Sequence, residues 1–185
     1  MSQTEKKKKA ILATTFVLLN NKEIKNITVD EIADKAVVSK VTLFKYYKNK
    51  NHLMNVVIMN ALKNMLVEVE AIIDSDLDFE DTYHAITAMK LKQLERYSAT
   101  FNQNLMVQYS ESPDFFDADA INAQLQIYDG LFEKGRVEGR ISPAITKNDF
   151  MFIIKIFIEG MKGLPAALLF QKADLITRFF INGFK

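Results

Sequence analysis

Residues Ile27 to Lys50, ITVDEIADKAVVSKVTLFKYYKNK, decide the fold of this 185-residue chain. Thr28 and Glu31 have the spacing of a capping box, so Thr28 is expected to begin a short helix. Apolar residues then recur at i, i+3, i+4 and i+7, the spacing of one helical face: Val29, Ile32, Ala33 and Ala36. The stretch therefore opens with a short amphipathic helix.

A second short helix is expected after the break at Val37 and Val38. Ser39 is a candidate N-cap for it, because a serine hydroxyl can accept a hydrogen bond from a backbone N–H of the first turn. Leu43 and Tyr47 lie four residues apart, which gives this helix a buried side. The sequence thus predicts two short helices joined by a tight turn.

The other side of the second helix is short, basic and free of carboxylates: Lys40, Val41, Thr42, Lys45 and Tyr46. A helix-turn-helix places such a helix in the DNA major groove. Lysines bind phosphates with release of counterions, whereas Thr and Val can contact base edges or a thymine methyl group. The alternative is a solvated helix in an ordinary bundle, and spacing alone does not decide between the two.

The segment IADKAVVSKVTLFKYYKNKNHLM resembles the recognition segment of the TetR family of bacterial transcriptional repressors, whose pattern is roughly I-A-x-x-A-G-V-S-x-x-T-L-Y-x-Y-F-x-[SN]-K-x-x-L. The matching positions are Ile32, Ala33, Ala36, Val38, Ser39, Thr42, Leu43, Tyr46, Asn49, Lys50 and Leu53. Val37 replaces the turn glycine of the family, and Phe44 replaces a tyrosine. Because a β-branched residue is costly at positive φ, we expect the turn to adopt another conformation.

The resemblance implies an all-helical fold with an N-terminal helix-turn-helix DNA-binding domain over residues 1–50. A C-terminal helical domain for ligand binding and dimerisation would follow over residues 51–185. It further implies a homodimeric repressor that binds a palindromic operator and is released by a small apolar or amphipathic effector. In that setting Thr28, Ser39 and Lys50 would hold DNA phosphates.

Apolar periodicity and capping signals predict about nine helices and no convincing strand. The helix that follows the two short ones begins at Asn49 and continues to Ile73. The expected ranges of the other helices outside the recognition segment are 6–20, 79–97, 99–109, 117–139 and 146–161, with a final helix that includes residues 168–180.

Charge is distributed unevenly along the chain. Residues 1–64 hold 12 lysines and 5 acidic residues, a net charge of +7, while the remainder carries −6. A basic N-terminal third on an acidic body favours nucleic acid as the partner of one end and argues against a membrane-surface role for the rest. The chain has no cysteine and no apolar run of about 20 residues, so we expect a cytoplasmic bacterial protein without disulfides or membrane helices.

The four lysines Lys6–Lys9 precede an apolar stretch, as in a secretory signal peptide. A small-residue cleavage site is missing, however, and the stretch continues into a polar segment. We therefore interpret it as the first amphipathic helix.

We find no catalytic or metal-binding constellation, and we expect neither a cofactor nor enzymatic activity. The body is rich in Met and aromatic residues, which form adaptable apolar walls for small molecules, although each of them fits an ordinary core equally well. The candidate ligand-contacting residues are His84, Phe101, Met106, Tyr128 and Phe132.

The helix that begins near Thr146 and the final helix are strongly apolar, which suggests more than one buried side. In the TetR family the last two helices of each subunit form the dimer interface. The candidate interface residues are Ile153, Phe157, Gly160, Met161, Phe179 and Phe180, and the alternative for each is the core of a single chain.

Two further hypotheses remain open at this point. One is a helical ligand-binding or scaffolding protein that no longer reads DNA, for which Val37 in place of glycine is a hint. The other is an all-helical enzyme, which the lack of a catalytic constellation disfavours.

Overall fold

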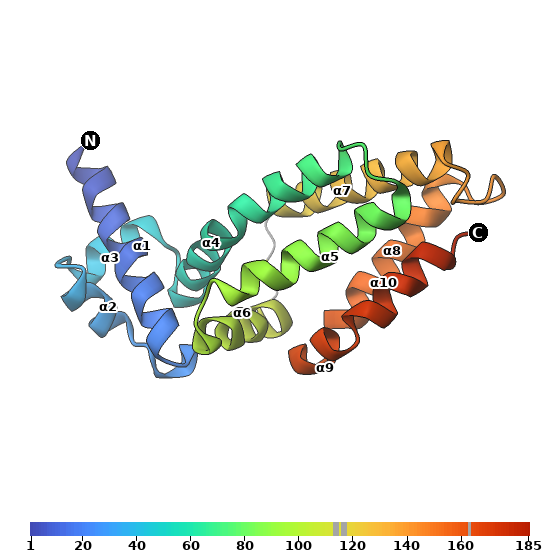
Figure 1. Ribbon diagram of the computed structural model, residues 1–185. Helices are drawn as coiled ribbons and strands as arrows, with labels where there is room; N and C mark the ends of the chain where they lie inside the picture. Colours follow the sequence, from blue (N-terminus) through green and yellow to red (C-terminus); the bar gives the residue numbers. More distant parts are fainter. Residues whose placement is uncertain (113–114, 116–117, 163) are drawn as a thin grey trace. The chain divides into compact units, whose positions relative to one another are not determined.

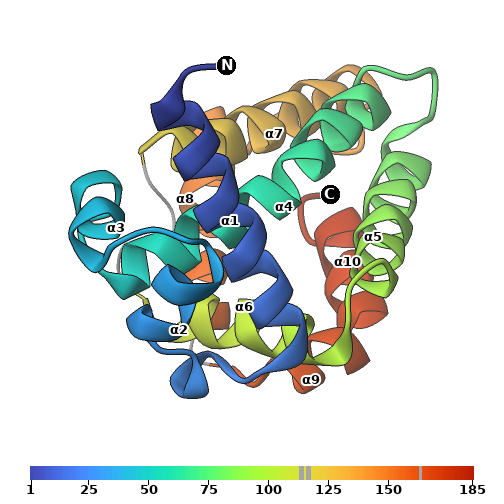
Figure 2. The same ribbon diagram turned by 90° about the vertical axis from the view of Figure 1, so that its left-hand side faces the viewer.

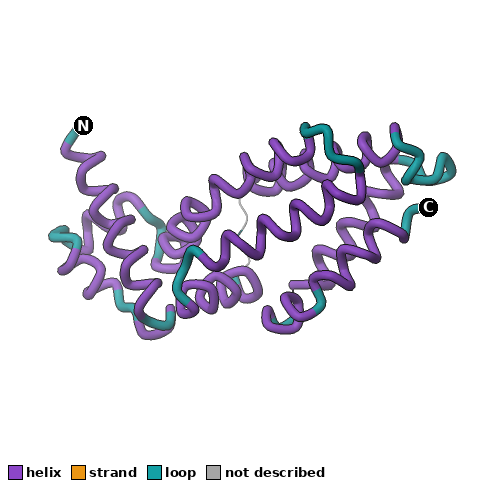
Figure 3. The backbone as a smooth tube through the Cα atoms, in the orientation of Figure 1, coloured by secondary structure: helices purple, strands orange, loops and turns teal. Residues whose placement is uncertain are grey.

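Helices are the only regular elements in the part of the chain that the computed structural model describes, which comprises residues 1–112, 115, 118–162 and 164–185 (Figure 3). The elements, labelled in Figure 1, are α1 (Gln3–Asn21), a 3-10 turn (Ile24–Asn26), α2 (Val29–Lys35), α3 (Lys40–Tyr46), α4 (Lys50–Ile73), α5 (Phe79–Glu95), α6 (Ala99–Glu111), α7 (Ala118–Val137), α8 (Lys147–Lys162), α9 (Ala166–Gln171) and α10 (Ala173–Asn182). The all-helical fold predicted from the sequence is confirmed.

Side-chain caps begin the first three helices after α1. Thr28 accepts a hydrogen bond from the Glu31 N–H at 3.1 Å, and Ser39 accepts one from the Thr42 N–H at 3.1 Å. Asn49 accepts one from the His52 N–H at 2.8 Å, one residue before α4 begins. All three predicted caps are confirmed, since each satisfies a backbone donor that the helix itself leaves unpaired.

The C-terminal segment differs from the prediction of a single final helix. It forms two helices, α9 and α10, on either side of Lys172, whose backbone (φ −102°, ψ 7°) departs from helical geometry. The described residues therefore form ten α-helices instead of about nine. None of the described helices is long and apolar enough to cross a membrane.

Packing divides the chain into two compact units. The first consists of Met1–Lys63 and Glu95–Phe116, and so combines α1, α2 and α3 with the start of α4 and with α6. Within it α1 contacts both α2 and α6, and α2 contacts α3 (Figure 2). Its fully buried side chains include Ile11, Leu19, Ile32, Leu43 and Leu53. The first unit thus fixes the two short helices against a core of their own.

The second unit consists of Asn64–Leu94 and Asp117–Lys185. Its core is aromatic: Phe150 lies 4.8 Å from Phe184 and 5.4 Å from Phe132, measured between ring centroids. Large apolar side chains on α4, α5, α7, α8 and α10 complete this core. The predicted domain division after residue 50 does not coincide with the division into packing units, and it stays a prediction about function.

The turn between α2 and α3 corrects one expectation. Val37 adopts φ +54°, the left-handed conformation that we expected this β-branched residue to avoid. The Val38 N–H donates to the Ala33 carbonyl and the Val37 N–H donates to the Asp34 carbonyl, which is the Schellman arrangement at a helix end. These two hydrogen bonds end α2 and impose the left-handed backbone, and the strain of the side chain is the cost.

Replacement Val37→Gly is expected to raise the free energy of unfolding by about 1 kcal/mol. Glycine removes the strain of a left-handed Cβ, and the greater freedom of glycine in the unfolded chain offsets part of this gain. The Val37 side chain is 89% exposed, so its loss removes little packing. Urea unfolding of the variant provides the measurement.

Val41→Gly is the matched control, because Val41 is 80% exposed but lies inside helix α3. This variant should lose about 0.5 kcal/mol, the difference in helix propensity between valine and glycine. If Val37→Gly were as destabilising as the control, the turn would not store the strain described here.

Candidate DNA-binding site

Helix α3 packs against the core of the first unit with one side and exposes the other side to solvent. Leu43 is fully buried and Tyr47 is 6% exposed, as predicted. On the opposite side Lys40, Val41 and Lys45 are exposed, while Thr42 and Tyr46 are half-buried. Phe44 also belongs to this face, since 45% of its side chain is exposed. Its position three residues after Val41 was the signal in the sequence, but Phe44 was not among the predicted residues.

Helix α3 itself has no carboxylate on this face, as predicted, but the neighbouring helix α2 supplies one. Asp30, on α2, forms an ion pair with the Lys40 ammonium group. Both side chains are more than half exposed, so the pair contributes little stability and its charges are accessible to ions. The Thr42 hydroxyl lies 2.9 Å from the hydroxyl of Ser39, the N-cap of α3, so the two side chains are within hydrogen-bonding distance.

One of the N-terminal lysines, Lys8, contacts the same face from α1. The ammonium group of Lys8 lies 5.4 Å from the centre of the Tyr46 ring, within the range of a cation–π contact. Lys6, Lys7 and Lys9 are exposed on the same helix. Lys8 was not among the predicted site residues, although the run of four lysines at positions 6–9 was a signal in the sequence. Positive charge therefore gathers from α1 and α3 around Tyr46.

A buried amide holds the segment that leads into the helix-turn-helix. Asn104, on α6, is 1% exposed. Its side-chain oxygen accepts a hydrogen bond from the Ile24 N–H at 2.8 Å, and its amide group donates to the carbonyls of Leu19 and Lys22 at 2.8 Å and 2.7 Å. Asn104 thus satisfies three backbone groups at the end of α1 and in the turn that follows.

Lys50 holds the same turn from α4. Its ammonium group donates to the Ile24 carbonyl at 2.7 Å, and burial lowers the pKa of the Lys50 side chain below its ordinary value. The predicted phosphate contact of Lys50 is not tested by this arrangement, since an ammonium group has two further donors. Ile24 is therefore fixed through its N–H by Asn104 and through its carbonyl by Lys50.

Amide and hydroxyl side chains also join α4 to α6. Gln108 donates to Asn51 at 2.9 Å and to Asn55 at 2.6 Å, and both asparagines donate to the Ser112 hydroxyl, at 2.8 Å and 2.9 Å. Asn55, Gln108 and Ser112 are buried, whereas Asn51 is exposed at the edge of the network. Such a network is specific because its buried members need their partners in place. Together with Asn104, this network joins α6 to α1, to the turn that follows α1 and to α4.

The five predicted ligand residues are divided between the two packing units. Phe101 is fully buried in the first unit, where its ring packs on Tyr97 at 4.6 Å, and the half-buried Met106 lies in the same unit. In the second unit Phe132 belongs to the aromatic core, Tyr128 is half-buried beside it, and His84 is exposed. Phe101 and Phe132 therefore have core partners of their own, and the ligand-contacting role of all five stays a prediction.

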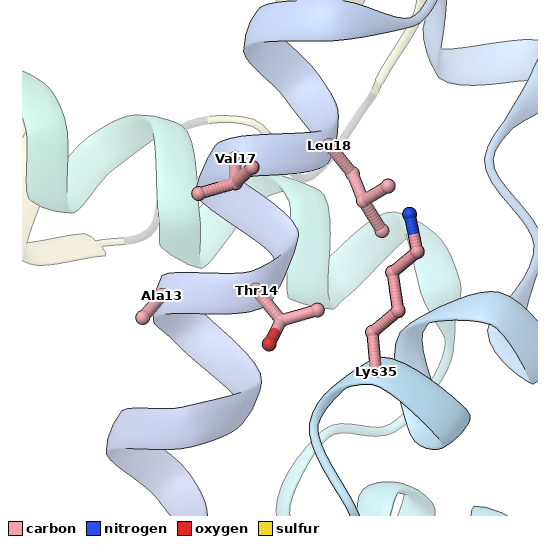
Figure 4. Close-up of a pocket in the computed structure, with 5 residues that line it drawn as sticks. All are labelled: Ala13, Thr14, Val17, Leu18 and Lys35. Atoms are coloured by element: carbon pink, nitrogen blue, oxygen red, sulfur yellow. The ribbon is translucent and has the colours of Figure 1, made fainter.

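One hollow of about 320 Å³ lies on the surface of the first unit (Figure 4). Ala13, Thr14, Val17 and Leu18 of α1 and Lys35 of α2 line it, and the Lys35 side chain extends along the hollow towards Leu18 (Figure 4). The Lys35 ammonium group is paired with Glu31 at 3.1 Å. The predicted ligand residues are not among those that line this hollow.

The predicted interface residues on α8 and α10 have mixed environments. Phe180 is buried, and Ile153, Phe157 and Met161 are half-buried. Gly160 and Phe179 are exposed. Exposed apolar side chains that the sequence analysis did not select lie near them in the sequence: Phe152 at 65%, Ile156 at 54% and Leu175 at 55%. Their i, i+4 spacing with one another and with Gly160 and Phe179 was the available signal.

These observations define the class of the protein: an all-helical protein whose N-terminal unit contains a helix-turn-helix with an exposed basic second helix. Residues 11–57 match the family model described as "Bacterial regulatory proteins, tetR family". The match runs from Ile11, within α1, to Val57 in α4 and includes all eight predicted DNA-binding residues. It confirms the resemblance to the TetR family of transcriptional regulators over this part of the chain.

Solved structures share the fold over nearly the whole chain. The fatty acid degradation regulator FadR from Bacillus halodurans aligns with a TM-score of 0.65 and 14% identity, over 96% of this chain and 100% of that one. The transcriptional regulator FadR from Bacillus subtilis, in complex with stearoyl-CoA, has a TM-score of 0.65 and 13% identity, over 95% and 92%.

A putative TetR-family transcription regulator from Shewanella sp. PV-4 has a TM-score of 0.57 and 20% identity, over 96% of this chain and 86% of that chain. No curated protein sequence matches the chain. At these identities the solved structures establish the fold.

Replacement Asn104→Ala is expected to lower the free energy of unfolding by about 2–3 kcal/mol, because it leaves buried backbone groups without partners. Urea unfolding measures the loss. Gln103→Ala is the control, since Gln103 is exposed on the same helix and its loss should cost less than about 0.5 kcal/mol. Equal stability of the two variants would show that Asn104 does not hold the turn.

Proposed function

We propose that this protein is a homodimeric repressor that binds a palindromic DNA operator through α3 and is released by a small amphipathic effector. The observation that carries the proposal is the exposed face of α3, which a buried Leu43 and Tyr47 fix in place. A helix-turn-helix inserts its second helix into the major groove, and the two heads of a dimer read half-sites about one helical turn apart.

Electrostatics supports DNA as the partner of this face. Residues 1–64 carry a net charge of +7, whereas the rest of the chain carries −6. Lys40 and Lys45 flank the apolar residues of α3, and Lys8 approaches Tyr46 from α1. Each lysine that neutralises a phosphate releases a counterion, so affinity falls as salt rises.

The residues assigned to DNA keep the roles expected from the sequence. Lys40, Val41, Thr42, Lys45 and Tyr46 contact the major groove or its rim. The hydroxyl groups of Thr28 and Ser39, together with Lys50, contact phosphates at the edges of the groove.

Dimerisation through α8 and α10 accounts for their exposed apolar side chains. Phe152 and Ile156 lie one turn apart on α8, and Leu175 and Phe179 lie one turn apart on α10. A Cβ at Gly160 would meet no atom within 4 Å, so the backbone of α8 is open to close approach there. A partner subunit would remove these side chains from water. The sequence-predicted Ile153, Phe157, Met161 and Phe180 would support the face from behind.

The chemical class of the effector is proposed from the fold likeness. One structure with the same fold, from Bacillus subtilis, is a complex with stearoyl-CoA. An acyl-CoA has a long apolar chain and a charged head, which agrees with the amphipathic effector expected from the sequence. Stearoyl-CoA, with free coenzyme A as the comparison, is therefore the first compound to add to a DNA-binding assay. Release requires only that the ligand prefer a dimer whose heads do not match the operator.

Binding to DNA from the promoter region of the gene itself, against competitor DNA and at two salt concentrations, tests the proposal. The double replacement of Lys45 and Tyr46 by Ala is expected to weaken operator binding by about a hundredfold, since each of two heads loses contacts worth about 1–3 kcal/mol. The thermal midpoint should change little because the core residues of α3 are untouched.

Lys92→Ala is the charge-matched control, because Lys92 is exposed on α5, outside the helix-turn-helix. It should bind the operator as the parent does. Parental affinity in the double variant would show that another face reads DNA. Weak binding that is equal for all sequences would favour instead a helical ligand-binding or scaffolding protein.

Replacement Ile156→Asp is expected to convert the dimer into a monomer, because a carboxylate in an apolar interface loses its hydration without gaining a partner. Light scattering coupled to size-exclusion chromatography measures the mass. Val67→Asp is the control: Val67 is 61% exposed on α4, away from the proposed interface in sequence, and its variant should remain dimeric. A dimeric Ile156→Asp variant would place the interface elsewhere.

A further inference from the structure

The recognition helix lacks the side chains that most often read bases. The residues of α3 are KVTLFKY, without Arg, Asn, Gln, Asp or Glu. Arg or Lys paired with guanine and Asn or Gln paired with adenine are the usual bidentate contacts in the major groove, and acidic side chains accept from cytosine. Of these contacts, α3 could make only the one between lysine and guanine, through Lys40 or Lys45.

Two of the polar side chains of α3 already interact with other residues of the protein. Lys40 is paired with Asp30, and the Thr42 hydroxyl lies 2.9 Å from the Ser39 hydroxyl. Lys45 carries a mobile point charge on a flexible stem, which suits phosphate better than a defined base edge. Hydrogen-bond readout from this helix is therefore sparse.

Two of the side chains that project from α3 are apolar. Val41 is 80% exposed and Phe44 is 45% exposed, and residues three apart on a helix are neighbours on its surface. The major groove offers one apolar group, the C5 methyl of thymine. Lysines on both sides of the pair, at positions 40 and 45, favour a polyanion over an apolar protein surface. Two side chains are also too few for a stable protein interface, which needs roughly 1,200 Å² or more.

We propose that Val41 and Phe44 determine sequence specificity by packing on thymine methyl groups, so that the half-site is fixed by its thymines. The inference rests on the proposed function, because it needs α3 to lie in the major groove. It goes further in naming the chemical group that is read and the residues that read it.

Selection from a random duplex pool tests the inference with the full-length parent protein. The enriched half-site should hold thymine at fixed positions. Uracil in place of one such thymine removes only the methyl group, and affinity should fall about fourfold, the equivalent of ~0.8 kcal/mol for one buried methyl-sized group. Uracil at flanking positions outside the half-site should have no effect.

Variants assign the contact to its side chain. In Val41→Ala or Phe44→Ala the difference between thymine and uracil should disappear at one fixed position and persist at the others. Val17→Ala is the matched control, because Val17 is 58% exposed on α1 and does not belong to α3; it should keep the full difference at every position.

The outcomes separate the inference from the proposed function. An enriched site with equal affinity for thymine and uracil overturns the methyl readout and leaves the DNA-binding function standing. A fourfold loss that both alanine variants retain shows that other residues contact the methyl groups, which also overturns the inference. No enriched site at all overturns the proposed function and the inference together.

Discussion

The presentation of α3 depends on a buried hydrogen-bonding group, the side-chain amide of Asn104. It fixes the end of α1 and the turn before α2 through three backbone hydrogen bonds, and Lys50 bonds the same turn at the Ile24 carbonyl. Leucine in that position would fill the space and leave the three backbone groups unsatisfied. The amide therefore specifies one geometry for the turn, and the turn sets where α2 and α3 begin.

Helix α3 has one buried side and one exposed side, although it is only seven residues long. Seven residues cannot form a stable helix alone, because nucleation is unfavourable and few hydrogen bonds are gained. Leu43 and Tyr47 supply the missing stability through tertiary packing, and Ser39 supplies the first cap. Every other outward position is then free to vary without loss of fold. This is how a short helix can carry an apolar, lysine-flanked surface that is poor in hydrogen-bonding groups.

Local signals in the sequence predicted a large part of the fold. Thr28, Ser39 and Asn49 each mark a helix start because a cap is a contact between residues three apart. The long helix α4 was also predicted, to its last residue, Ile73. Such features depend on neighbours along the chain, so spacing alone reveals them.

Features that depend on distant partners were missed. Asn104 is an unremarkable residue in sequence, since its three partners are about 80 residues away. The sequence could not show whether Phe152 and Ile156 are exposed or lie in the core. Periodicity shows that one side of a helix is apolar, but it does not show what covers that side. Val37 departs from its prediction for another reason. The intrinsic preference of valine disfavours positive φ, but the two Schellman hydrogen bonds are together stronger than that preference.

The division into packing units constrains how an effector can act in the proposed mechanism. Helix α6 belongs with α1, α2 and α3, to which Asn104 and the amide network around Gln108 tie it. A ligand cannot shift α3 relative to α6 without breaking these buried hydrogen bonds, so the two move together. The chain passes from the first unit to the second at residues 63–64 and back at residues 94–95. The first of these crossings lies inside α4, a continuous helix from Lys50 to Ile73, and a helix transmits a displacement along its axis with little loss. In this mechanism α4 is therefore an element through which effector binding in the body would shift the positions of the DNA-binding heads.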